Sequence, residues 1–362
     1  MTDIAADVPS AATPVPRRLP RGALLGLGAL ALLVLLPFVV GEYWIKSIAL
    51  PTLIFGLAAL GLNVVVGAAG QISMGHAAFM AVGAFVGAIA YGRYGLPLPL
   101  ALLAAGASAA AVAALVGLPS RRIRGLYLMV STLAAQVVVI WLMQRLPWFG
   151  ASAHGVLSLP KLAFGPIAFD SATAKYLLTL AVAAPLTLFA ANLLRSPLGR
   201  AWIAIREREI AAEVLGVAAF RHKLIAFAVS GFYAGVAGAL VTFAWTGAAT
   251  IEEYRLELSV KLLGMIIIGG LGSVLGSYLG AAFIALTPIV VSVALHRGAD
   301  AFGGGVNAGT LANAEHLIFG LLIVGFLIAE PRGLAHLFER AGTAAQSVLR
   351  RVTRRPGPSQ ET

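Results

Sequence analysis

The sequence predicts an all-α polytopic membrane protein with about ten transmembrane helices. Only 11% of its 362 residues are charged and 59% are hydrophobic, whereas an average soluble domain is about 25% charged. Apolar runs of about 20 residues recur from end to end, and each is long enough to cross the hydrocarbon core of a bilayer as a helix. The runs do not alternate apolar and polar residues as the strands of a membrane barrel do. Composition and run length together therefore predict a helical bundle.

Ten apolar runs are candidate spans. The first follows a polar segment, residues 1–21, and resembles the apolar region of a signal peptide. It is long for such a region and no clear small-residue cleavage site follows it, which favours an uncleaved first span. In chain order the runs are roughly 22–40, 45–66, 74–91, 98–118, 125–143, 175–194, 223–245, 258–271, 276–295 and 314–329.

The positive charges favour one orientation. If the ten spans alternate from a cytoplasmic N-terminus, most of the 26 basic residues fall on the cytoplasmic side. Lys and Arg are enriched in cytoplasmic loops, so this split favours both termini in the cytoplasm and explains the net charge of +11 without nucleic acid. We expect a cytoplasmic extension 1–21, a transmembrane domain 22–335 and a basic cytoplasmic tail 336–362. The longest outer loop, 144–174, either covers the mouth of the bundle, meets a partner or simply connects two spans.

No predicted span carries Asp or Glu near its middle. A proton-driven carrier usually needs a carboxylate or a His relay inside the membrane, and the one notable ionisable residue at depth is His76. Coupling through a buried acid is therefore disfavoured, although backbone carbonyls could still coordinate Na⁺. The chain has no GxSxG, HExxH or CxxC motif and no cysteine. We expect a protein that is not an enzyme and that has no catalytic residues, no metal site and no bound cofactor.

The densest polar cluster is NVVVGAAGQISMGH, Asn63 to His76, in which three glycines interrupt the helical pattern. Polar, broken backbone at membrane depth is tolerated only where it is buried in protein or lines a cavity. The cluster is therefore either the lining or gate of a translocation path, or a cytoplasmic turn in which the histidine donates to a neighbouring carbonyl. The candidate path residues are Asn63, Gln71, Ser73 and His76.

A second glycine-rich stretch, GGLGSVLGSYLG at 269–280, lacks the GK[ST] ending and the preceding strand of a phosphate loop. Gly272, Gly276 and Gly280 are spaced by four, which predicts a smooth helix face for close packing. Packing is therefore favoured over ligand binding, and the two flanking spans should form a tight hairpin. The same spacing recurs in two further pairs, Gly83/Gly87 and Gly231/Gly235.

The charged segment Leu194–Lys223 interrupts the apolar chain. Ser196 followed by Pro197 is typical of a helix start. Helix-favouring residues follow as far as Gly216, where the helix should stop or bend. The apolar face of this short amphipathic helix holds Trp202, Ile205 and Ala212.

The polar face of the same segment carries both signs of charge. A helix that lies on anionic lipid favours a purely basic polar face, but here Glu207, Glu209 and Glu213 are mixed with arginines. Mixed charge suits a groove on a protein partner. The segment is therefore predicted to be a cytoplasmic docking site.

The amino-acid sequence of this segment resembles that of a known family. EIAAEVLGV (Glu209–Val217) is similar to the EAA-type loop of bacterial ABC importer permeases. GRAWIAIREREIAAEVLGV followed by RHKLIAFAVSGFYAGVAGAL is similar to the branched-chain amino acid permeases of the LivM type. Three further blocks resemble that family in the same order, namely GLNVVVGAAGQISMGHAAF (61–79), SVKLLGMIIIGGLGSVLGSYLGA (259–281) and EPRGL (330–334). The first 20 residues, the outer loop and the basic tail match poorly.

The resemblance implies a type II-like ABC importer permease bundle in the bacterial inner membrane. The segment 194–223 would dock in a cleft of a cytoplasmic ATPase subunit, with ATP and Mg held by that partner and no nucleotide on this chain. The partners would be a second, LivH-like permease, two ATPase subunits, a periplasmic binding protein and membrane lipid, with no nucleic acid. The residues assigned to ATPase coupling are Arg206, Glu209, Ala211, Ala212, Glu213 and Gly216.

The resemblance also bounds the cargo. It implies translocation of branched-chain amino acids or related small polar solutes. The missing intramembrane carboxylate agrees with energy supplied from outside the membrane. The alternative function is an ion- or proton-coupled secondary transporter that acts alone.

Overall fold

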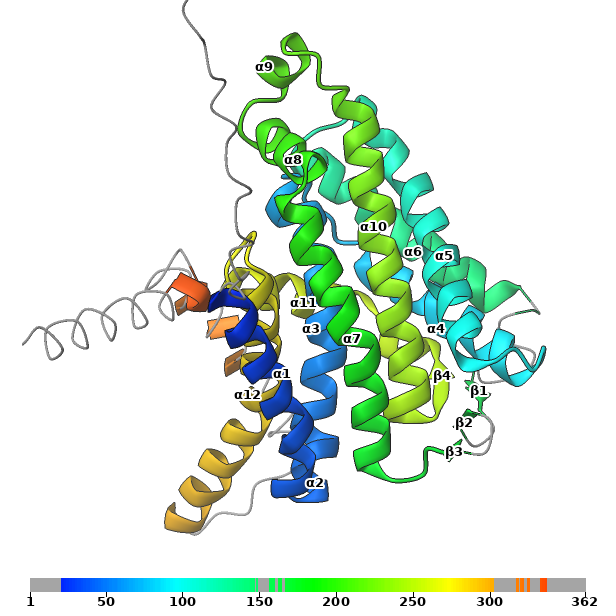
Figure 1. Ribbon diagram of the computed structural model, residues 1–362, viewed down its shortest axis with the longest axis vertical. Helices are drawn as coiled ribbons and strands as arrows, with labels where there is room; N and C mark the ends of the chain where they lie inside the picture. The colour runs from blue at the N-terminus through cyan, green and yellow to red at the C-terminus, as the bar shows by residue number, and fades with distance from the viewer. Residues whose placement is uncertain are drawn as a thin grey trace, which may run out of the picture.

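A computed structural model describes residues 21–146, 148, 156–159, 162–164, 167–302, 317–318, 320–321, 324–325 and 333–336. Within these residues the chain is mostly helical, and Figure 1 shows the long helices running side by side as one bundle. The long helices are α1 (Arg21–Val39), α3 (Leu50–Asn63), α4 (His76–Gly92), α5 (Leu98–Gly117), α6 (Leu126–Arg145), α7 (Ala172–Arg195), α10 (Ala219–Leu240), α11 (Leu256–Gly269) and α12 (Val274–Phe302).

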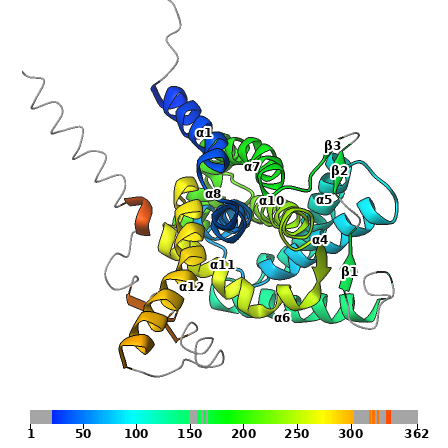
Figure 2. The ribbon, with the colours of Figure 1, turned by 90° about the horizontal axis from the view of Figure 1, so that it is seen from below.

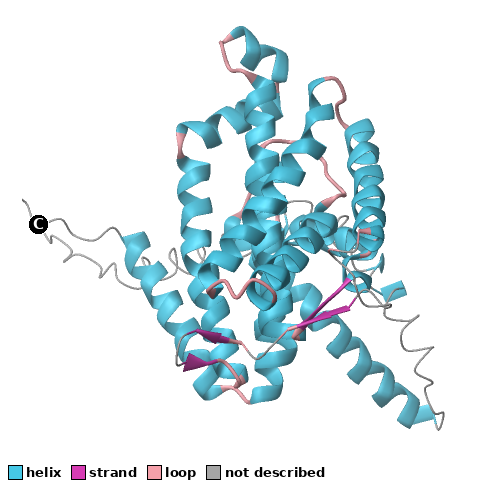
Figure 3. Ribbon diagram, turned by 90° about the vertical axis from the view of Figure 1, so that its right-hand side faces the viewer, coloured by secondary structure: helices cyan, strands magenta, loops and turns pink. Residues whose placement is uncertain are grey.

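Short elements lie at the two ends of the bundle. Figure 1 shows α8 and α9 at one end and α2 with the strands at the other, and Figure 3 shows how small the strands are in the helical molecule. The short helices are α2 (Glu42–Trp44), α8 (Pro197–Glu207) and α9 (Glu209–Val214), with 3₁₀ turns η3 (Leu118–Arg121) and η5 (Ile251–Tyr254). The π-helical turns are η1 (Ile45–Ala49), η2 (Val64–Ala68) and η4 (Val241–Thr246), and the strands are β1 (Val156–Ser158), β2 (Ala163–Phe164), β3 (Ile167–Ala168) and β4 (Ala248–Thr250).

The strands qualify the prediction of an all-α chain. Part of the outer loop 144–174 forms β1, which pairs antiparallel with β4 at the end of α10 in the register Val156↔Thr250, Leu157↔Ala249 and Ser158↔Ala248. The next two strands, β2 and β3, pair with each other. The loop is thus tied to the bundle, because the extended backbone on both sides satisfies its hydrogen bonds by pairing.

Six helices of the described chain are long and apolar enough to cross a membrane, fewer than the ten spans predicted. The run at 74–91 forms α4, which begins only at His76, and the run at 258–271 forms α11. Both helices are shorter than these six. Of the predicted span 314–329, the structure describes only 317–318, 320–321 and 324–325, which are helical, and the rest lies outside the described residues. The six are 42–68, 98–121, 126–145, 172–195, 219–246 and 274–293.

The core of the bundle is formed by α3, α4 and α10. Nearly every residue of α3 and α4 is buried, as expected for helices that are apolar all round and surrounded by others. Helix α10 packs against α4, α5 and α3, while α3 also packs against α11 and α12. Figure 2, which looks along the bundle, shows α10 next to α4 and α5. Helices α5, α6 and α7 bury one face each and leave apolar side chains on the other, as a lipid-facing helix does.

The predicted glycine stripes bring helices together. A Cβ at Gly83 would overlap the backbone of Gly235, and a Cβ at Gly231 would lie 2.6 Å from the carbonyl oxygen of Ala109. Helices α4 and α5 therefore approach α10 at backbone distance, which only small residues permit. This confirms the packing role predicted for both pairs.

The prediction of a third stripe, at Gly272, Gly276 and Gly280, was only partly right. Gly276 and Gly280 pack against the backbone of α11, so α11 and α12 form the tight hairpin that was expected. Gly272 does not lie on the helix face, because α12 begins at Val274. It sits in the turn with a φ of +81°, a left-handed conformation for which glycine is the natural residue.

Candidate functional site

The charged segment folds into two short helices. The Ser196 hydroxyl caps α8 by accepting a hydrogen bond from the Gly199 amide, which confirms the predicted start. Gly216 ends α9 with a φ of +89°, as predicted for a glycine that closes a helix. The prediction of one helix up to Gly216 was wrong at Arg208, whose extended backbone (φ −152°, ψ 95°) separates α8 from α9. The break turns the chain so that α9 stands beyond the bundle at the end shown uppermost in Figure 1.

The apolar face of α8 and α9 anchors the pair to the bundle. Trp202 is fully buried, and its Nε1 donates to the carbonyl oxygen of His222 at 2.8 Å. Ile205 and Ala212 are buried together with Ala219, the first residue of α10. All three predicted face residues therefore point inward, and the remaining sides of the two helices stay exposed.

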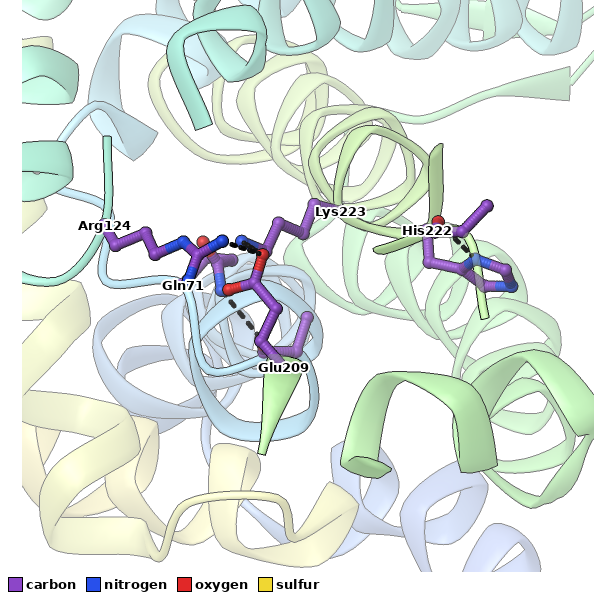
Figure 4. Close-up of polar contacts among 7 residues, drawn as sticks. Gln71, Arg124, Glu209, His222 and Lys223 are labelled. Carbon is purple, nitrogen blue, oxygen red and sulfur yellow. Dashed lines mark hydrogen bonds and ion pairs between the residues drawn. The ribbon is translucent and has the colours of Figure 1, made fainter. Parts of the chain in front are cut away.

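Glu209 forms an ion cluster at the base of α9. Its Oε1 lies 2.7 Å from Nζ of Lys223 and 3.3 Å from Nη2 of Arg124, and Figure 4 shows the three side chains meeting. The Lys223 side chain is only 1% exposed, and a buried ammonium is costly unless it is paired. Glu209 therefore holds α9 against α10 and against the loop after α5.

Part of the outward surface of α9 is apolar. Ile210 and Val214, one turn apart on the helix, are 70% and 83% exposed, and Leu215, which directly follows the helix, is 84% exposed. Sequence reasoning missed these three residues, although the spacing of four between Ile210 and Val214 in EIAAEVLGV was a visible signal. Of the residues predicted for ATPase coupling, Ala211, Glu213 and Gly216 are exposed beside them, while Ala212 is buried.

Arg206 joins α8 to the broken segment after α3. Its Nη1 donates to the carbonyl oxygen of Gly67, and its side chain covers Gly70 so closely that a Cβ there would lie 2.5 Å from Arg206 Cγ. Gly70 has a φ of +68° and can face Arg206 because it has no side chain. The structure thus brings Arg206 from the coupling set into contact with the glycines of the predicted path.

The broken segment is held by side chains from neighbouring helices. The chain leaves α3 through the π-helical turn η2 and reaches α4 without regular hydrogen bonds at 70–75. The amide of Met74 donates to Thr132 Oγ1 of α6 at 3.0 Å, and the amide of Ala77 donates to Ser259 Oγ of α11 at 2.9 Å. These contacts satisfy backbone groups that a helix would otherwise pair, which is required at membrane depth.

The four candidate path residues are buried and have protein partners. His76 is fully buried, and its Nε2 lies 3.0 Å from the Ala58 carbonyl oxygen. This contact agrees with the predicted alternative in which the histidine donates to a neighbouring carbonyl. Gln71 donates to the carbonyl oxygen of Ala69 at 3.1 Å, and Ser73 accepts from the Gly75 amide. Figure 4 shows Gln71 in the same view as the Glu209 cluster. In this conformation their polar atoms serve the local fold.

Asn63 is the strongest of these polar links. Its Nδ2 donates to the Ser273 carbonyl oxygen and to Ser277 Oγ, both at 2.9 Å, and its Oδ1 accepts from the Gly272 amide at 2.7 Å. The side chain therefore ties the end of α3 to the turn between α11 and α12. Polar side chains that pair across helices are a common means of joining them inside a membrane.

The sequence that forms these two helices and the buried polar links has known relatives. A family model described as "Branched-chain amino acid transport system / permease component" matches residues 44–327. The chain belongs to this family. The match confirms the family that the sequence motifs indicate, and it covers both the α8–α9 segment and the broken segment 63–76.

Two curated relatives, both LivM permease proteins, resemble the chain over most of its length, and a third resembles a shorter part. The LivM permease protein of the high-affinity branched-chain amino acid transport system of Escherichia coli strain K12 is 34% identical over 84% of this chain and 73% of its own length. The LivM protein of Salmonella typhimurium is 32% identical over 85% of this chain and 73% of its own length. The autoinducer 2 import permease LsrC of Klebsiella pneumoniae is 30% identical over 38% of this chain and 37% of its own length.

Proposed function

We propose that the chain is the membrane-spanning subunit of an ATP-driven importer of branched-chain amino acids in the bacterial inner membrane. Its membership of the permease family and the LivM relatives support this function. The six apolar helices support a multi-pass membrane protein. On this proposal the chain transports and does not catalyse, and ATP and Mg bind to partner subunits.

The observation that carries the coupling role is the apolar outer surface of α9. Ile210, Val214 and Leu215 stand exposed at the end of the bundle, where neither α8 nor α10 covers them. Contiguous exposed apolar residues with a polar rim mark protein interaction sites. The proposed occupant is the cleft of a cytoplasmic ATPase subunit, with Glu213 and the Gly216 turn at its edge.

Two contacts would carry movement from α9 into the bundle. The Glu209–Lys223 ion pair connects α9 to α10, and the hydrogen bond from Arg206 connects α8 to Gly67 in the turn after α3. Asn63 then connects the same end of α3 to the α11–α12 turn. A displacement of the coupling helices therefore acts on α10, on α3 and on the α11–α12 turn at once. The residues 63–76 are proposed to respond as a gate, which opens only when these links rearrange.

The assembly that follows contains more chains than this one. We infer a second, LivH-like permease beside it, two ATPase subunits on the α9 side and a periplasmic binding protein on the side of β1–β4. Both termini would lie in the cytoplasm, and lipid would cover the exposed apolar faces of α5, α6 and α7.

The docking role can be tested with Val214→Asp, which places a charge on the apolar tip of α9. We expect the ATPase subunits to stop co-purifying with the permease, while the amount of permease in the membrane is unchanged because Val214 is 83% exposed. Leu118→Asp is the matched control, since Leu118 is an exposed apolar residue of η3, which leads into the loop that holds Arg124. Undiminished co-purification of the Val214 variant would contradict the docking role.

The transport role has a separate test. The complex reconstituted in liposomes should take up branched-chain amino acids only when ATP reaches the ATPase side. Uptake by the isolated chain, driven by an ion gradient alone, would instead support the secondary transporter.

A further inference from the structure

A pocket opens at the end of the bundle opposite α8 and α9. It has a volume of about 410 Å³ and lies among η1, α3, η4, η5, α11 and α12. Its rim includes Tyr43 and Trp245, which are 65% and 41% exposed, so the pocket reaches the surface. The volume is within the range of small-molecule sites, about 300–1,000 Å³. If α9 faces the cytoplasm, this pocket faces the outer side.

The walls of the pocket are mainly apolar and partly aromatic. Phe55 of α3 and Trp245 of η4 meet edge to face, with ring centroids 5.7 Å apart. Met265 of α11 and Ile284 and Pro288 of α12 complete the apolar lining. Such a surface accommodates a branched aliphatic group, because it offers apolar contact area that the group can cover.

Two opposite charges lie in this apolar lining. Glu253 forms no ion pair with any residue in the part of the chain that the structure describes, and partial burial raises the pKa of its carboxyl group. Lys261 binds Glu257 through Nζ at 2.9 Å, which leaves two of its three N–H donors for another acceptor. The neighbouring Glu252 pairs with Arg255 and does not line the pocket.

We propose that this pocket binds an α-amino acid with an apolar side chain as a zwitterion. The ammonium group would pair with Glu253, the carboxylate would accept from Lys261, and the side chain would lie against Phe55, Trp245 and Met265. The link to import rests on the proposed function, but the binding itself does not. A lipid chain would fill the apolar wall and leave both charges unused, and a simple ion would use only one of them. Of these three ligands, only the zwitterion uses the apolar wall and both charges.

The binding can be tested on the full chain in lipid nanodiscs, without its partners. The probe is a leucine analogue that carries a diazirine in its side chain, and the labelled peptides are identified by mass spectrometry. We expect labelling of peptides that contain Phe55, Trp245 or Met265, with L-leucine as a competitor. Glu253→Gln and Lys261→Gln should each weaken binding about tenfold or more, because each removes one charged partner of the ligand.

Two matched controls have the same chemistry outside the pocket. Glu252→Gln changes the acid next to Glu253, and Lys46→Gln changes a lysine that pairs with a glutamate four residues away, as Lys261 does. Both controls should label as the wild type does. Equal labelling of the Glu253 variant and the wild type would overturn the proposal, as would labelling that phospholipid displaces and L-leucine does not.

The transport assay separates this inference from the proposed function. If the wild-type complex imports no amino acid with ATP but the pocket is labelled as expected, the proposed function fails and the pocket remains. If the wild-type complex imports the amino acid with ATP but its pocket is not labelled, the binding proposal is refuted and the proposed function remains.

Discussion

Replacing Glu209 with Gln should release α9 from the bundle. The Glu209 carboxylate lies 2.7 Å from the Lys223 ammonium, and Lys223 has no other ion-pair partner among the described residues. The Lys223 side chain is 1% exposed, so water cannot solvate the ammonium group once the carboxylate is removed. The amide that takes its place can accept a hydrogen bond but does not neutralise the lysine.

The magnitude follows from the burial of each partner. Removing one member of a buried ion pair costs about 3–5 kcal/mol. The Glu209 side chain is 17% exposed, which allows some solvation and favours the lower end, about 3 kcal/mol. The contact with Arg124 adds at most about 1 kcal/mol, because Arg124 is 53% exposed. Since 1.4 kcal/mol is a factor of ten, 3 kcal/mol weakens the docking of α9 by about 150-fold.

Hydrogen exchange of the chain in nanodiscs measures this change directly. The amides of Ala212 and of 215–217, which are hydrogen-bonded within the α9 turn, should exchange about 150-fold faster in Glu209→Gln. Arg124→Gln is the matched control and should change the rate by less than about fivefold. The double variant Glu209→Gln/Lys223→Met should recover most of the protection, because it also removes the uncompensated buried charge. The reasoning is refuted if the double variant exchanges as fast as the single one.

Three other outcomes follow from the structure. Gly70→Ala should lower ATP-driven uptake at least tenfold while the ATPase stays bound, because a methyl group at a φ of +68° is strained and meets Arg206; uptake and co-purification in one preparation check this. Asn63→Leu removes three short hydrogen bonds, each worth about 1 kcal/mol, and a longer one of 3.5 Å to the Gly270 carbonyl oxygen, so thermal unfolding should show a loss of about 3 kcal/mol, against about 1 kcal/mol for Ser277→Ala. The raised pKa of Glu253 means that the folded chain holds this proton to a higher pH than the unfolded chain, so stability should fall as pH rises from the ordinary carboxyl pKa through the raised one. The midpoints of thermal unfolding, measured across this pH range, should lose that decrease in Glu253→Gln.

The sequence was sufficient for features that depend on local pattern. Apolar runs gave most of the long helices, glycine spacing gave the contacts of α10 with α4 and α5, and the Ser196 and Gly216 signals gave both ends of the coupling segment. Each of these is decided within about one helical turn of the residues that signal it. The family was also recognisable from blocks of the sequence, without any contact between distant residues.

The features that the sequence did not give depend on distant partners. Nothing around Glu209 shows that Lys223 and Arg124 will enclose it, so its mixed-charge neighbourhood indicated an outward docking role. The break at Arg208 has the same origin, because it brings Glu209 to the bundle at the expense of helix continuity. The pocket combines Phe55, Glu253 and Lys261 from three separate elements, and no spacing along the chain brings them together.

The position of the π-helical turns connects the two ends of the molecule. Helix α3 is flanked by η1, which contributes Ser47 to the pocket, and by η2, which contributes Gly67 to the contact with Arg206. The third π-helical turn, η4, ends α10 and carries Trp245 in the pocket wall. Such turns hold one extra residue per hydrogen-bonded loop and often occur at functional sites. On the proposed function, a displacement of Gly67 is either absorbed within η2 or transmitted to the pocket through α3, which is rigid between its two turns. Deleting one residue of η2, which converts it to regular α-helix, would decide between the two in an uptake assay. The variant keeps its coupling only if the displacement is transmitted through α3.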